Sequence, residues 1–472
     1  MGHTIRFGTD GWRGVIAEDF TFDNVRICAQ ALAGYLKEAN IASKGMIVGY
    51  DTRFASEHFA AAVAEVFAGN SIKTYLCQKP TPTPVVSYNV VARGAAGAVV
   101  ITASHNPAIW NGFKIKTAQG TSAPPEATAE IEKRLPGLLA GGLVKRVVLE
   151  EGLKQGTIET ISAESVYLER LKQLIDMENI RNSPLKIVVD PMYGAAAGYF
   201  PMILSGGQAE VLEINPERNP IFPGINPEPI APNLGKLSRQ VKGQVASVGI
   251  ATDGDGDRLG IVDEDGKVLT QPQIFALLIL YLLEVKKERG AIVKTITSTR
   301  MAERLADLYQ LPLYEVSVGF RHVAPTMARE RAMIGGEESG GFAFRGHILD
   351  RDGILAGLSF LDLMVRLKKS PSQLISYLYE KVGTWHYQRI DLKVPEGKRD
   401  SIADTMRRQT HIGRKAVVKL NTMDGLHFSF ADGSWLLCRL SGTEPLLRLY
   451  AEGTTEEETA TLLAEARKLV SV

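Results

Sequence analysis

Short apolar runs that end in polar loops alternate with longer amphipathic stretches over most of the chain. Apolar runs of this length are typical of buried strands, and the longer periodic stretches are typical of helices. Strand–helix–strand alternation predicts α/β units with mainly parallel sheets, in which ligands bind at the carboxyl ends of the strands. We expect strands at 46–51, 96–102, 186–190, 246–253 and 291–297, and helices at 23–37, 57–68, 163–177 and 273–287.

The final part of the chain has a different pattern and predicts an α+β module. Thr455 and Glu458 match a capping box, so we expect a last helix to begin near Thr455. The stretches at 136–155, rich in glycine and leucine, and 368–371, Lys-Lys-Ser-Pro, are the best linker candidates. Short strands with few helices between them are expected at 385–394, 416–420, 426–430, 435–440 and 446–451.

Composition and charge narrow the class of protein. With 472 residues, 45% apolar and 23% charged, the chain is globular in composition and too long for one hydrophobic core. A formal net charge of +1 argues against a general polyanion binder. The three cysteines have neither metal-ligand nor disulfide-framework spacing. No signal sequence is evident, and the apolar run at 274–283 is too short to span a bilayer. We therefore expect a cytoplasmic protein with no nucleic-acid or membrane partner.

A serine follows one of the predicted buried strands. Residues 102–107 read Thr-Ala-Ser-His-Asn-Pro, and Asn-Pro favours a turn, so we expect Ser104 at a strand-to-loop corner with its hydroxyl exposed. An ordinary Ser/Asn turn explains this segment equally well. Lys114 follows in Asn-Gly-Phe-Lys-Ile, where a lysine can act as an acid or base, neutralise phosphate, or be a simple surface charge.

Three carboxylates alternate with glycines in the segment 253–258, Asp-Gly-Asp-Gly-Asp-Arg. Such carboxylates repel one another unless a hard cation lies between them. A calcium-binding EF-hand loop is excluded because its sixth position requires glycine, which is Arg258 here, and because strands flank the segment. Mg²⁺ commonly takes a few carboxylates together with phosphate oxygens. The segment therefore predicts a Mg²⁺ site that meets a phosphate carried by another loop.

Two further loops have the chemistry of a sugar-phosphate site. Residues 335–341, Gly-Gly-Glu-Glu-Ser-Gly-Gly, place paired acids where they can accept hydrogen bonds from sugar hydroxyls, although a flexible acidic turn is the simpler alternative. In residues 439–448, two arginines bracket a Ser-Gly-Thr loop that can surround an anion. Charge-assisted hydrogen bonds of that kind contribute roughly 1.5–3 kcal/mol each.

In this order, these motifs resemble the α-D-phosphohexomutases, which include phosphoglucomutase, phosphomannomutase and phosphoglucosamine mutase. Residues 7–14 are similar to the family's N-terminal active-site loop, and the four segments above are similar to its phosphoserine, metal, sugar and phosphate loops. The resemblance covers nearly the whole chain. It implies three related α/β domains with mixed, mainly parallel sheets plus a C-terminal α+β domain around a central cleft. We expect these domains at 1–150, 151–266, 267–371 and 372–472.

The resemblance also implies a mechanism. Ser104 would carry a phosphoryl group and donate it to the free hydroxyl of a sugar monophosphate, and the resulting 1,6-bisphosphate would turn over in the cleft and return its other phosphate to Ser104. Such transfer depends on charge neutralisation and in-line positioning. Glucose 1,6-bisphosphate would be intermediate and activator. Small-molecule sugar phosphates would be the partners of a monomer or homodimer.

The same resemblance implies which residues carry these roles. Whether His322 or His347 is the general acid/base or a structural histidine is left open by the sequence. The expected catalytic residues are Ser104, Arg13, Lys114 and His105, and the expected Mg²⁺ ligands are Asp253, Asp255, Asp257 and a phosphate oxygen on Ser104. The expected substrate-binding residues are Arg258, Arg321, His322, Glu337, Ser339, His347, Arg439, Ser441, Gly442, Thr443 and Arg448.

Among these motifs, the sugar loop differs most between mutases that act on different sugars. Glu-Glu-Ser-Gly resembles the glucose-type mutases, whereas mixed mannose/glucose enzymes more often have Glu-Met-Ser-Gly followed by histidine, and glucosamine enzymes have Glu-Gln-Ser-Gly. Gly341 stands where that histidine would follow, although the Ser-Gly-Thr-Glu-Pro loop is also common in glucosamine mutases. We favour phosphoglucomutase over phosphomannomutase, with phosphoglucosamine mutase third. A non-catalytic sugar-phosphate sensor and a simple phosphatase are the alternatives from other classes, and the presence of Ser104 and the three aspartates argues against the sensor.

Overall fold

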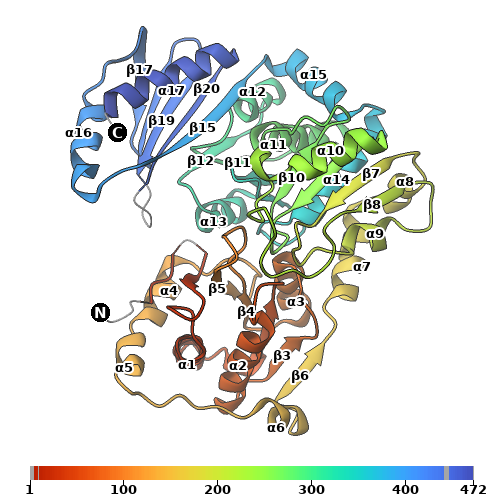
Figure 1. Cartoon of the computed structure of the whole chain (residues 1–472), viewed down its shortest axis with the longest axis vertical. Coiled ribbons are helices and arrows are strands. Elements are labelled where there is room, and N and C mark those ends of the chain that lie inside the picture. Colours follow the sequence, from red (N-terminus) through yellow and green to blue (C-terminus); the bar gives the residue numbers. More distant parts are fainter. Residues whose placement is uncertain (1–4, 9, 441–445, 471–472) are drawn as a thin grey trace. The chain divides into compact units, whose positions relative to one another are not determined.

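The computed structural model describes residues 5–8, 10–440 and 446–470, which divide into two units. The first unit combines residues 1–269 with 339–372, and the second combines 270–338 with 373–472 (Figure 1). No helix within the described ranges is both long enough and apolar enough to cross a bilayer.

A mixed sheet of six strands forms the N-terminal part of the first unit, in the order β1-β5-β4-β2-β3-β6. Strands β2, β3, β4 and β6 are parallel, and β5 and β1 join at one edge in antiparallel pairs. The strands are β1 (Trp12–Val15), β2 (Met46–Tyr50), β3 (Thr74–Cys77), β4 (Gly97–Ile101), β5 (Trp110–Thr117) and β6 (Ile158–Ile161). The helices are α1 (Phe22–Glu38), α2 (Ser56–Gly69), α3 (Thr83–Arg93), α4 (Pro125–Glu132), α5 (Leu135–Leu139) and α6 (Leu149–Lys154).

Close packing explains the small residues in this sheet. Every position of β2 and β4 is buried, as expected of central parallel strands. A Cβ at Gly49 would lie 2.4 Å from a methyl group of Val86 on α3, so only glycine lets this helix approach the sheet. The edge strand β6 lies after residue 150, and the stretch 136–155 contains most of α5 and all of α6. The chain of the first sheet therefore continues beyond the segment that we expected to be a linker.

A second mixed sheet completes the first unit, in the order β10-β9-β7-β8. A single helix was expected at 163–177, but it breaks at Asp176, whose side chain accepts the Asn179 N–H (3.2 Å) and starts a new helix. The strands are β7 (Lys186–Asp190), β8 (Glu210–Glu213), β9 (Val248–Thr252) and β10 (Leu259–Val262), of which only β10 is antiparallel. The remaining elements are α7 (Glu164–Leu174), α8 (Met177–Arg181), α9 (Tyr199–Leu204), α10 (Gly235–Gln244), β14 (Phe342–Phe344) and α14 (Gly353–Leu367).

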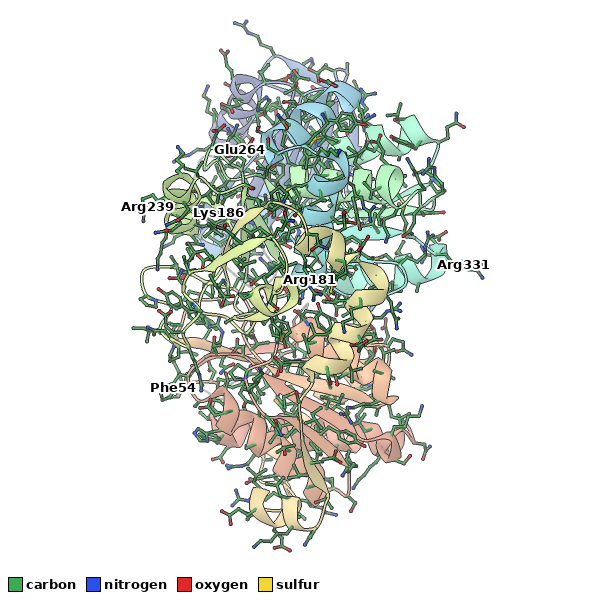
Figure 2. The ribbon with its side chains drawn as sticks, turned by 90° about the vertical axis from the view of Figure 1, so that its right-hand side faces the viewer. Phe54, Arg181, Lys186, Arg239, Glu264 and Arg331 are labelled. Carbon is green, nitrogen blue, oxygen red and sulfur yellow. The ribbon has the colours of Figure 1, made fainter. Side chains whose placement is uncertain are left out.

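Charged side chains of this unit lie both on its helices and strands and in the turns between them. In Figure 2, Arg181 lies at the end of α8, Lys186 at the start of β7 and Arg239 on α10. Glu264, in the turn after β10, accepts hydrogen bonds from the hydroxyls of Ser370 and Ser372. The predicted linker at 368–371 therefore connects α14 to α15 (Pro371–Val382) but is held to the first unit.

The second unit begins with a parallel sheet in the order β12-β11-β13. The helix expected at 273–287 starts earlier because Thr270 and Gln273 form a capping box, and it ends in a π-helical turn at Tyr281–Val285. The strands are β11 (Ile292–Thr295), β12 (Leu313–Val316) and β13 (Ile334–Gly336), and the helices are α11 (Gln271–Leu280), α12 (Arg300–Tyr309) and α13 (Phe320–Glu330).

An antiparallel sheet of six strands forms the C-terminal part of the second unit, in the order β15-β20-β19-β18-β17-β16. Figure 1 shows α17 packed along this sheet, and the core between them contains buried apolar residues of both α16 and α17. The strands are β15 (His386–Lys393), β16 (His411–Ile412), β17 (Lys415–Asn421), β18 (Leu426–Phe430), β19 (Trp435–Leu440) and β20 (Leu446–Gly453), and the helices are α16 (Arg399–Arg407) and α17 (Glu456–Val470).

Only half of the expected capping box forms at the start of α17. The Thr455 hydroxyl accepts the Glu458 N–H at 3.1 Å, but the Glu458 carboxylate accepts the Thr454 N–H at 2.7 Å and pairs with Lys415. Three α/β parts with mainly parallel strands are followed by an antiparallel α+β module, so the predicted fold class is confirmed.

A buried carboxylate ties the two sheets of the second unit together. Glu452, on β20, accepts hydrogen bonds from the Thr299 hydroxyl (2.6 Å), the Arg300 N–H (2.7 Å) and the Trp435 indole N–H (2.9 Å). Burial raises the pKa of Glu452, and these donors oppose that effect. The N-terminus of α12 is thereby fixed to β19 and β20.

Replacing Glu452 by alanine should destabilise the second unit by about 3 kcal/mol, because it leaves buried donors without an acceptor. Urea unfolding followed by tryptophan fluorescence measures the change. The Glu456→Ala variant removes an exposed carboxylate from the same unit and should unfold like the wild type. Equal unfolding midpoints for both variants would contradict this role of Glu452.

Candidate active site

Ser104 lies just after β4 in the left-handed region, with φ of +52°. Its side chain is buried, with only 2% of the residue exposed, so the prediction of an exposed hydroxyl is wrong. The reason is the segment 253–258 between β9 and β10. It packs over residues 102–110, the loop that contains Ser104 and is called the serine loop below. A Cβ at Gly254 would lie 2.5 Å from the Ser104 carbonyl oxygen. The Ser104 hydroxyl donates to Asp253 Oδ2 at 2.6 Å.

Arg53 stabilises the serine loop through hydrogen bonds to its backbone. This role was not predicted from the sequence. The side chain is fully buried and its Nε donates to Asp51 Oδ2 at 3.1 Å. Its two terminal nitrogens donate to four backbone carbonyls of the loop, at distances of 2.6–3.0 Å: Ser104, Asn106, Pro107 and Trp110. The planar guanidinium therefore fixes the path of the backbone at Ser104 and in the residues that follow it, up to Trp110.

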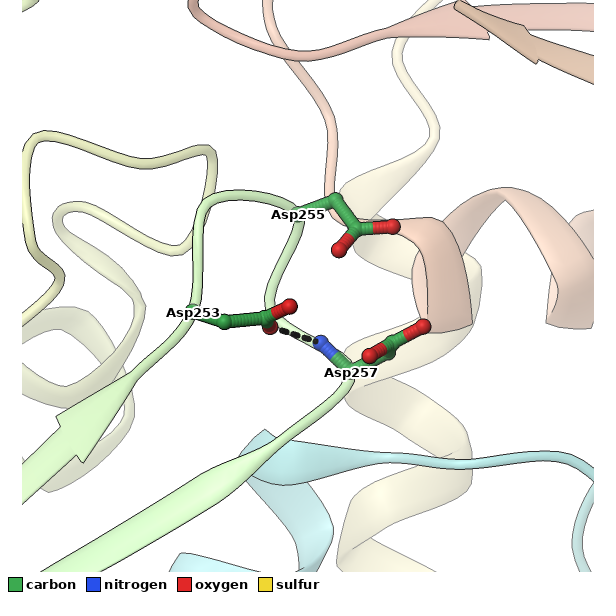
Figure 3. A group of neighbouring side chains, drawn as sticks. All are labelled: Asp253, Asp255 and Asp257. Carbon is green, nitrogen blue, oxygen red and sulfur yellow. Dashed lines mark hydrogen bonds between the residues drawn. The ribbon is translucent and has the colours of Figure 1, made fainter. Parts of the chain in front are cut away.

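The three aspartates of the segment 253–258 converge, as the sequence predicted (Figure 3). All three are buried, and a carboxylate oxygen of each lies within 4.8 Å of the others. Asp253 Oδ1 accepts the backbone N–H of Asp257 (2.9 Å) and of Arg258 (3.1 Å). Burial raises the pKa of Asp253 well above its usual value, and the charges of Asp255 and Asp257 raise it further. At Asp253, the nearby charge of Arg258 does not offset these effects.

The carboxylate oxygens of the three aspartates are suited to bind a divalent cation. The Oδ1 atoms of Asp255 and Asp257 are buried and have no hydrogen-bond partner among the described residues. Their Oδ2 atoms face Lys114, whose Nζ lies 2.8 Å from Asp255, 3.2 Å from Asp257 and 2.8 Å from Asp10. Buried carboxylate oxygens that accept no hydrogen bond are suitable ligands for a hard cation such as Mg²⁺.

Lys114 is an interior charge and not a surface one. Burial alone would lower its pKa, but the surrounding carboxylates of Asp10, Asp255 and Asp257 raise it above the usual value. The ammonium group therefore stays protonated at neutral pH.

Asp10 and Arg351 extend this ionic network and were also missed. Arg351 lies 2.9 Å from Asp257 and 2.6 Å from Asp10. Although burial raises the pKa of Asp10, the positive charges of Lys114, Lys116 and Arg351 bring it well below its usual value. Asp10 lies within residues 7–14, and Arg351 lies four positions after the candidate residue His347. Proximity to these predicted features was the signal available in the sequence.

Arg13, Arg258 and His105 lie near Ser104. Arg13 donates to the Asn106 side chain at 2.7 Å, and Arg258 pairs with Glu228 at 3.1 Å. His105 Nδ1 is 3.4 Å from the Ser104 hydroxyl oxygen. Burial lowers the pKa of His105 well below its usual value, and the neighbouring cations lower it further, so its ring is neutral at pH 7.

His347 lies elsewhere in the first unit, with its side chain almost completely buried. Its Nε2 is 2.9 Å from an Asp352 carboxylate oxygen, and its ring stacks on Tyr88 with centroids 5.3 Å apart. Asp352 also accepts the Tyr167 hydroxyl (2.9 Å) and caps the N-terminus of α14 through the Leu355 N–H. These partners belong to the helices α3, α7 and α14 and not to the serine loop.

The expected substrate residues of the second unit form two groups. Arg321 donates to His322 Nε2 at 3.2 Å at the start of α13. Burial lowers the pKa of His322, as does Arg321, and Asp424 opposes them. Arg439 and Arg448 are cross-strand neighbours on β19 and β20, so the two arginines flank the connecting loop as predicted. Ser441, Gly442 and Thr443 lie outside the described residues.

The two residues of the predicted sugar loop that were expected to bind hydroxyls differ in burial. Glu337 is buried in the second unit, and Ser339 is half-buried in the first.

Comparison with known proteins decides the family. Descriptions of the phosphoglucomutase/phosphomannomutase family match the chain in order: α/β/α domain I at 4–138, domain II at 165–266, domain III at 271–382 and the C-terminal domain at 390–469. The chain belongs to the α-D-phosphohexomutases.

Similar phosphohexomutases span almost the whole chain. A Methanothermobacter thermautotrophicus protein assigned as a phosphoglucosamine mutase is 33% identical over 454 residues, 96% of this chain and 94% of its own length. The phosphoglucomutase/phosphomannomutase of Thermococcus kodakarensis is 30% identical and covers 98% of both chains. A crystal structure from Thermus thermophilus, assigned as a phosphomannomutase, is 32% identical with a TM-score of 0.87 over the full length of both chains.

Substituting Arg53 by lysine should loosen the serine loop, because one ammonium nitrogen cannot donate to four carbonyls. We expect a loss of about 2–4 kcal/mol in unfolding free energy and faster amide hydrogen exchange over residues 103–110. The Arg366→Lys control changes a half-exposed arginine paired with Asp176 in the same unit and should leave both quantities unchanged. Unchanged exchange in the Arg53→Lys variant would show that the loop does not need the guanidinium.

Removing divalent cations should lower the thermal unfolding midpoint of the wild-type protein. A cation at 100 times its dissociation constant stabilises the folded state by about 2.7 kcal/mol. The double variant Asp255→Asn/Asp257→Asn should lose the difference between Mg²⁺ and EDTA, whereas Asp265→Asn, an exposed carboxylate beyond β10, should keep it. A Mg²⁺ effect that persists in the double variant would place the cation elsewhere.

Proposed function

We propose that this phosphohexomutase interconverts hexose 1-phosphate and hexose 6-phosphate through a phosphorylated Ser104, with glucose as its preferred sugar. The observation that carries the proposal is the buried Ser104 hydroxyl, which lies 2.6 Å from Asp253 in the aspartate cluster that Lys114 contacts. An ordinary turn serine has no need of such surroundings. A serine that carries a phosphate needs cations, and a cluster of carboxylates next to it is tolerable only if a cation is shared.

In the first transfer, the bond between phosphorus and the Ser104 oxygen breaks and a bond to the free hydroxyl of the sugar forms. The hydroxyl's proton passes to a base, and the second transfer reverses these changes at the other end of the bisphosphate. Asp253, Asp255 and Asp257 would hold Mg²⁺ together with a phosphate oxygen on Ser104, and the bound ion would neutralise phosphate charge. Glucose 1,6-bisphosphate is the proposed intermediate and activator.

Lys114, Arg13 and Arg258 act on the charge of the transferred phosphoryl group. Lys114 stays protonated because carboxylates surround it, so it stabilises negative charge and does not serve as a base. His105 is neutral and 3.4 Å from the Ser104 oxygen, which suits it to exchange a proton with that oxygen.

Of the two histidines left open by the sequence, His322 is the better candidate for a proton acceptor from the sugar. It is half-buried with a lowered pKa, so it is neutral at pH 7, and it follows Arg321 at the start of α13. His347 is engaged by Asp352 and stacked on Tyr88, and we assign it to the support of α14.

We assign the binding of the sugar hydroxyls to Glu337 and Ser339. We assign the binding of the distal phosphate to the loop between β19 and β20. Arg439 and Arg448 are cross-strand neighbours, which supports that assignment, because side chains in this register share a face of the sheet and a pair of guanidinium groups suits a doubly charged phosphate. Ser441, Gly442 and Thr443 complete the proposed loop.

Glucosamine phosphate is a second candidate substrate. The preference for glucose depends on Glu338, the second acid of the sugar loop, but this carboxylate is buried and lies 3.5 Å from Arg389 on β15. The identity of residue 338 therefore reflects a contact with the C-terminal sheet as well as the sugar. The Methanothermobacter thermautotrophicus relative is assigned as a phosphoglucosamine mutase, which favours this alternative.

The decisive experiment compares glucose, glucosamine and mannose 1-phosphates, each with Mg²⁺ and a trace of the matching 1,6-bisphosphate, by ³¹P NMR. We expect glucose 6-phosphate to form fastest, and Ser104→Ala to lower the rate by at least about a thousandfold, because phosphoryl transfer loses its carrier. Ser205→Ala, an exposed serine after α9, is the matched control.

Each outcome is informative. Faster turnover of glucosamine 1-phosphate would leave the mechanism intact and make the glucose assignment wrong. Release of inorganic phosphate without isomerisation would indicate a phosphatase, and full activity of Ser104→Ala would contradict the proposed carrier.

A further inference from the structure

The turn between β17 and β18 lies directly against the first arginine of the phosphate loop. Gly425 adopts a φ of +99°, and a Cβ there would lie 2.6 Å from the Cys438 carbonyl oxygen and 3.2 Å from Arg439 Cα. Only glycine lets the turn approach β19 so closely. Asp424, the preceding residue, is thereby brought beside the Arg439 side chain.

Asp424 uses its two carboxylate oxygens on two different segments. Oδ1 accepts a hydrogen bond from Arg439 Nε at 2.8 Å, and Oδ2 accepts the backbone N–H of Val318 at 2.8 Å. Burial would lower the pKa of Arg439, and the hydrogen bond and charge of Asp424 outweigh that effect and raise it. One side chain therefore joins β19 to the segment between β12 and α13.

Val318 is fixed at both its backbone and its side chain. The side chain packs against the apolar cluster of Ile296, Trp435, Leu437 and Tyr450, which includes residues of β19 and β20. Gly319 follows with a φ of +116°, and α13 begins at Phe320. The position of Val318 therefore determines where Arg321 and His322 lie, and the Asp424 charge acts on His322.

We propose that Asp424 is a positioning residue that holds the segment 318–322 and the phosphate-loop arginine Arg439 in fixed relation to each other. The proposal rests on the proposed function, in which both segments bind the sugar phosphate. A bisphosphate that must turn over before its second transfer needs its two binding segments aligned at each transfer, because misplaced groups lose much of the rate gained by positioning.

The test compares Asp424→Ala and Asp424→Asn with the control Asp432→Asn. Asp432 lies in the turn at the opposite end of β18 and pairs with Lys415, so the control removes the same charge from the same sheet. Hydrogen exchange of the peptide containing the Val318 amide reports the link without any assay of activity. Steady-state kinetics on glucose 1-phosphate, or on the hexose 1-phosphate that turns over fastest, report its effect on substrate.

In Asp424→Ala we expect at least tenfold faster exchange at Val318 and a KM raised roughly tenfold or more, the effect of losing one charge-assisted hydrogen bond. Asp424→Asn retains one acceptor oxygen and should give a smaller change, and Asp432→Asn should give none. Unchanged exchange, or faster exchange with an unchanged KM, would overturn the proposal. Absence of turnover by the wild-type protein on all three hexose 1-phosphates would contradict the proposed function, and the exchange rates would still decide whether Asp424 holds the segment.

Discussion

Three buried aspartates on the short turn between β9 and β10 impose an electrostatic constraint on the first unit. Carboxylates this close raise one another's pKa unless positive charge is supplied. The chain supplies part of that charge from distant segments, with Lys114 on β5 and Arg351 before α14 both in contact with the cluster. The unpartnered oxygens of Asp255 and Asp257 would accept further positive charge from a cation. The positions of β5 and of the segment before α14 can therefore be understood from the need to place positive charge beside the three aspartates.

The backbone around Ser104 meets a second requirement, which is rigidity. A left-handed residue on a turn is strained unless its surroundings hold it. Arg53 holds it by donating to the carbonyl oxygens of Ser104 and Asn106, while Asp51 neutralises the guanidinium. Phosphoryl transfer depends on in-line geometry, so a serine fixed in this way would lose little entropy at each transfer in its proposed role as carrier.

The sequence predicted the fold class and the elements that carry the motifs because apolar runs such as 97–101 are buried along their whole length. The convergence of Asp253, Asp255 and Asp257 was predictable, since all three lie on one short glycine-containing turn. The burial of Ser104 was not, because it depends on the contact between two loops separated by about 150 positions in the chain. The roles of Arg53 and Arg351 were missed for the same reason, because both residues act through contacts with segments distant in the chain.

The discontinuity of the first unit has a consequence for how the protein is made. Residues 339–372 contribute β14 and α14, and α14 is buried along nearly its whole length, with Phe200 against Gly357. During synthesis, β1 to β10 leave the ribosome before α14 has been made. Residues 270–338, which belong to the other unit, are made in between. Until then the apolar surface that α14 covers stays open and the aspartate cluster lacks Arg351. The nascent first unit therefore has to wait, incompletely closed, during synthesis of the intervening segment, and this interval is when it is most exposed to aggregation and most dependent on chaperones.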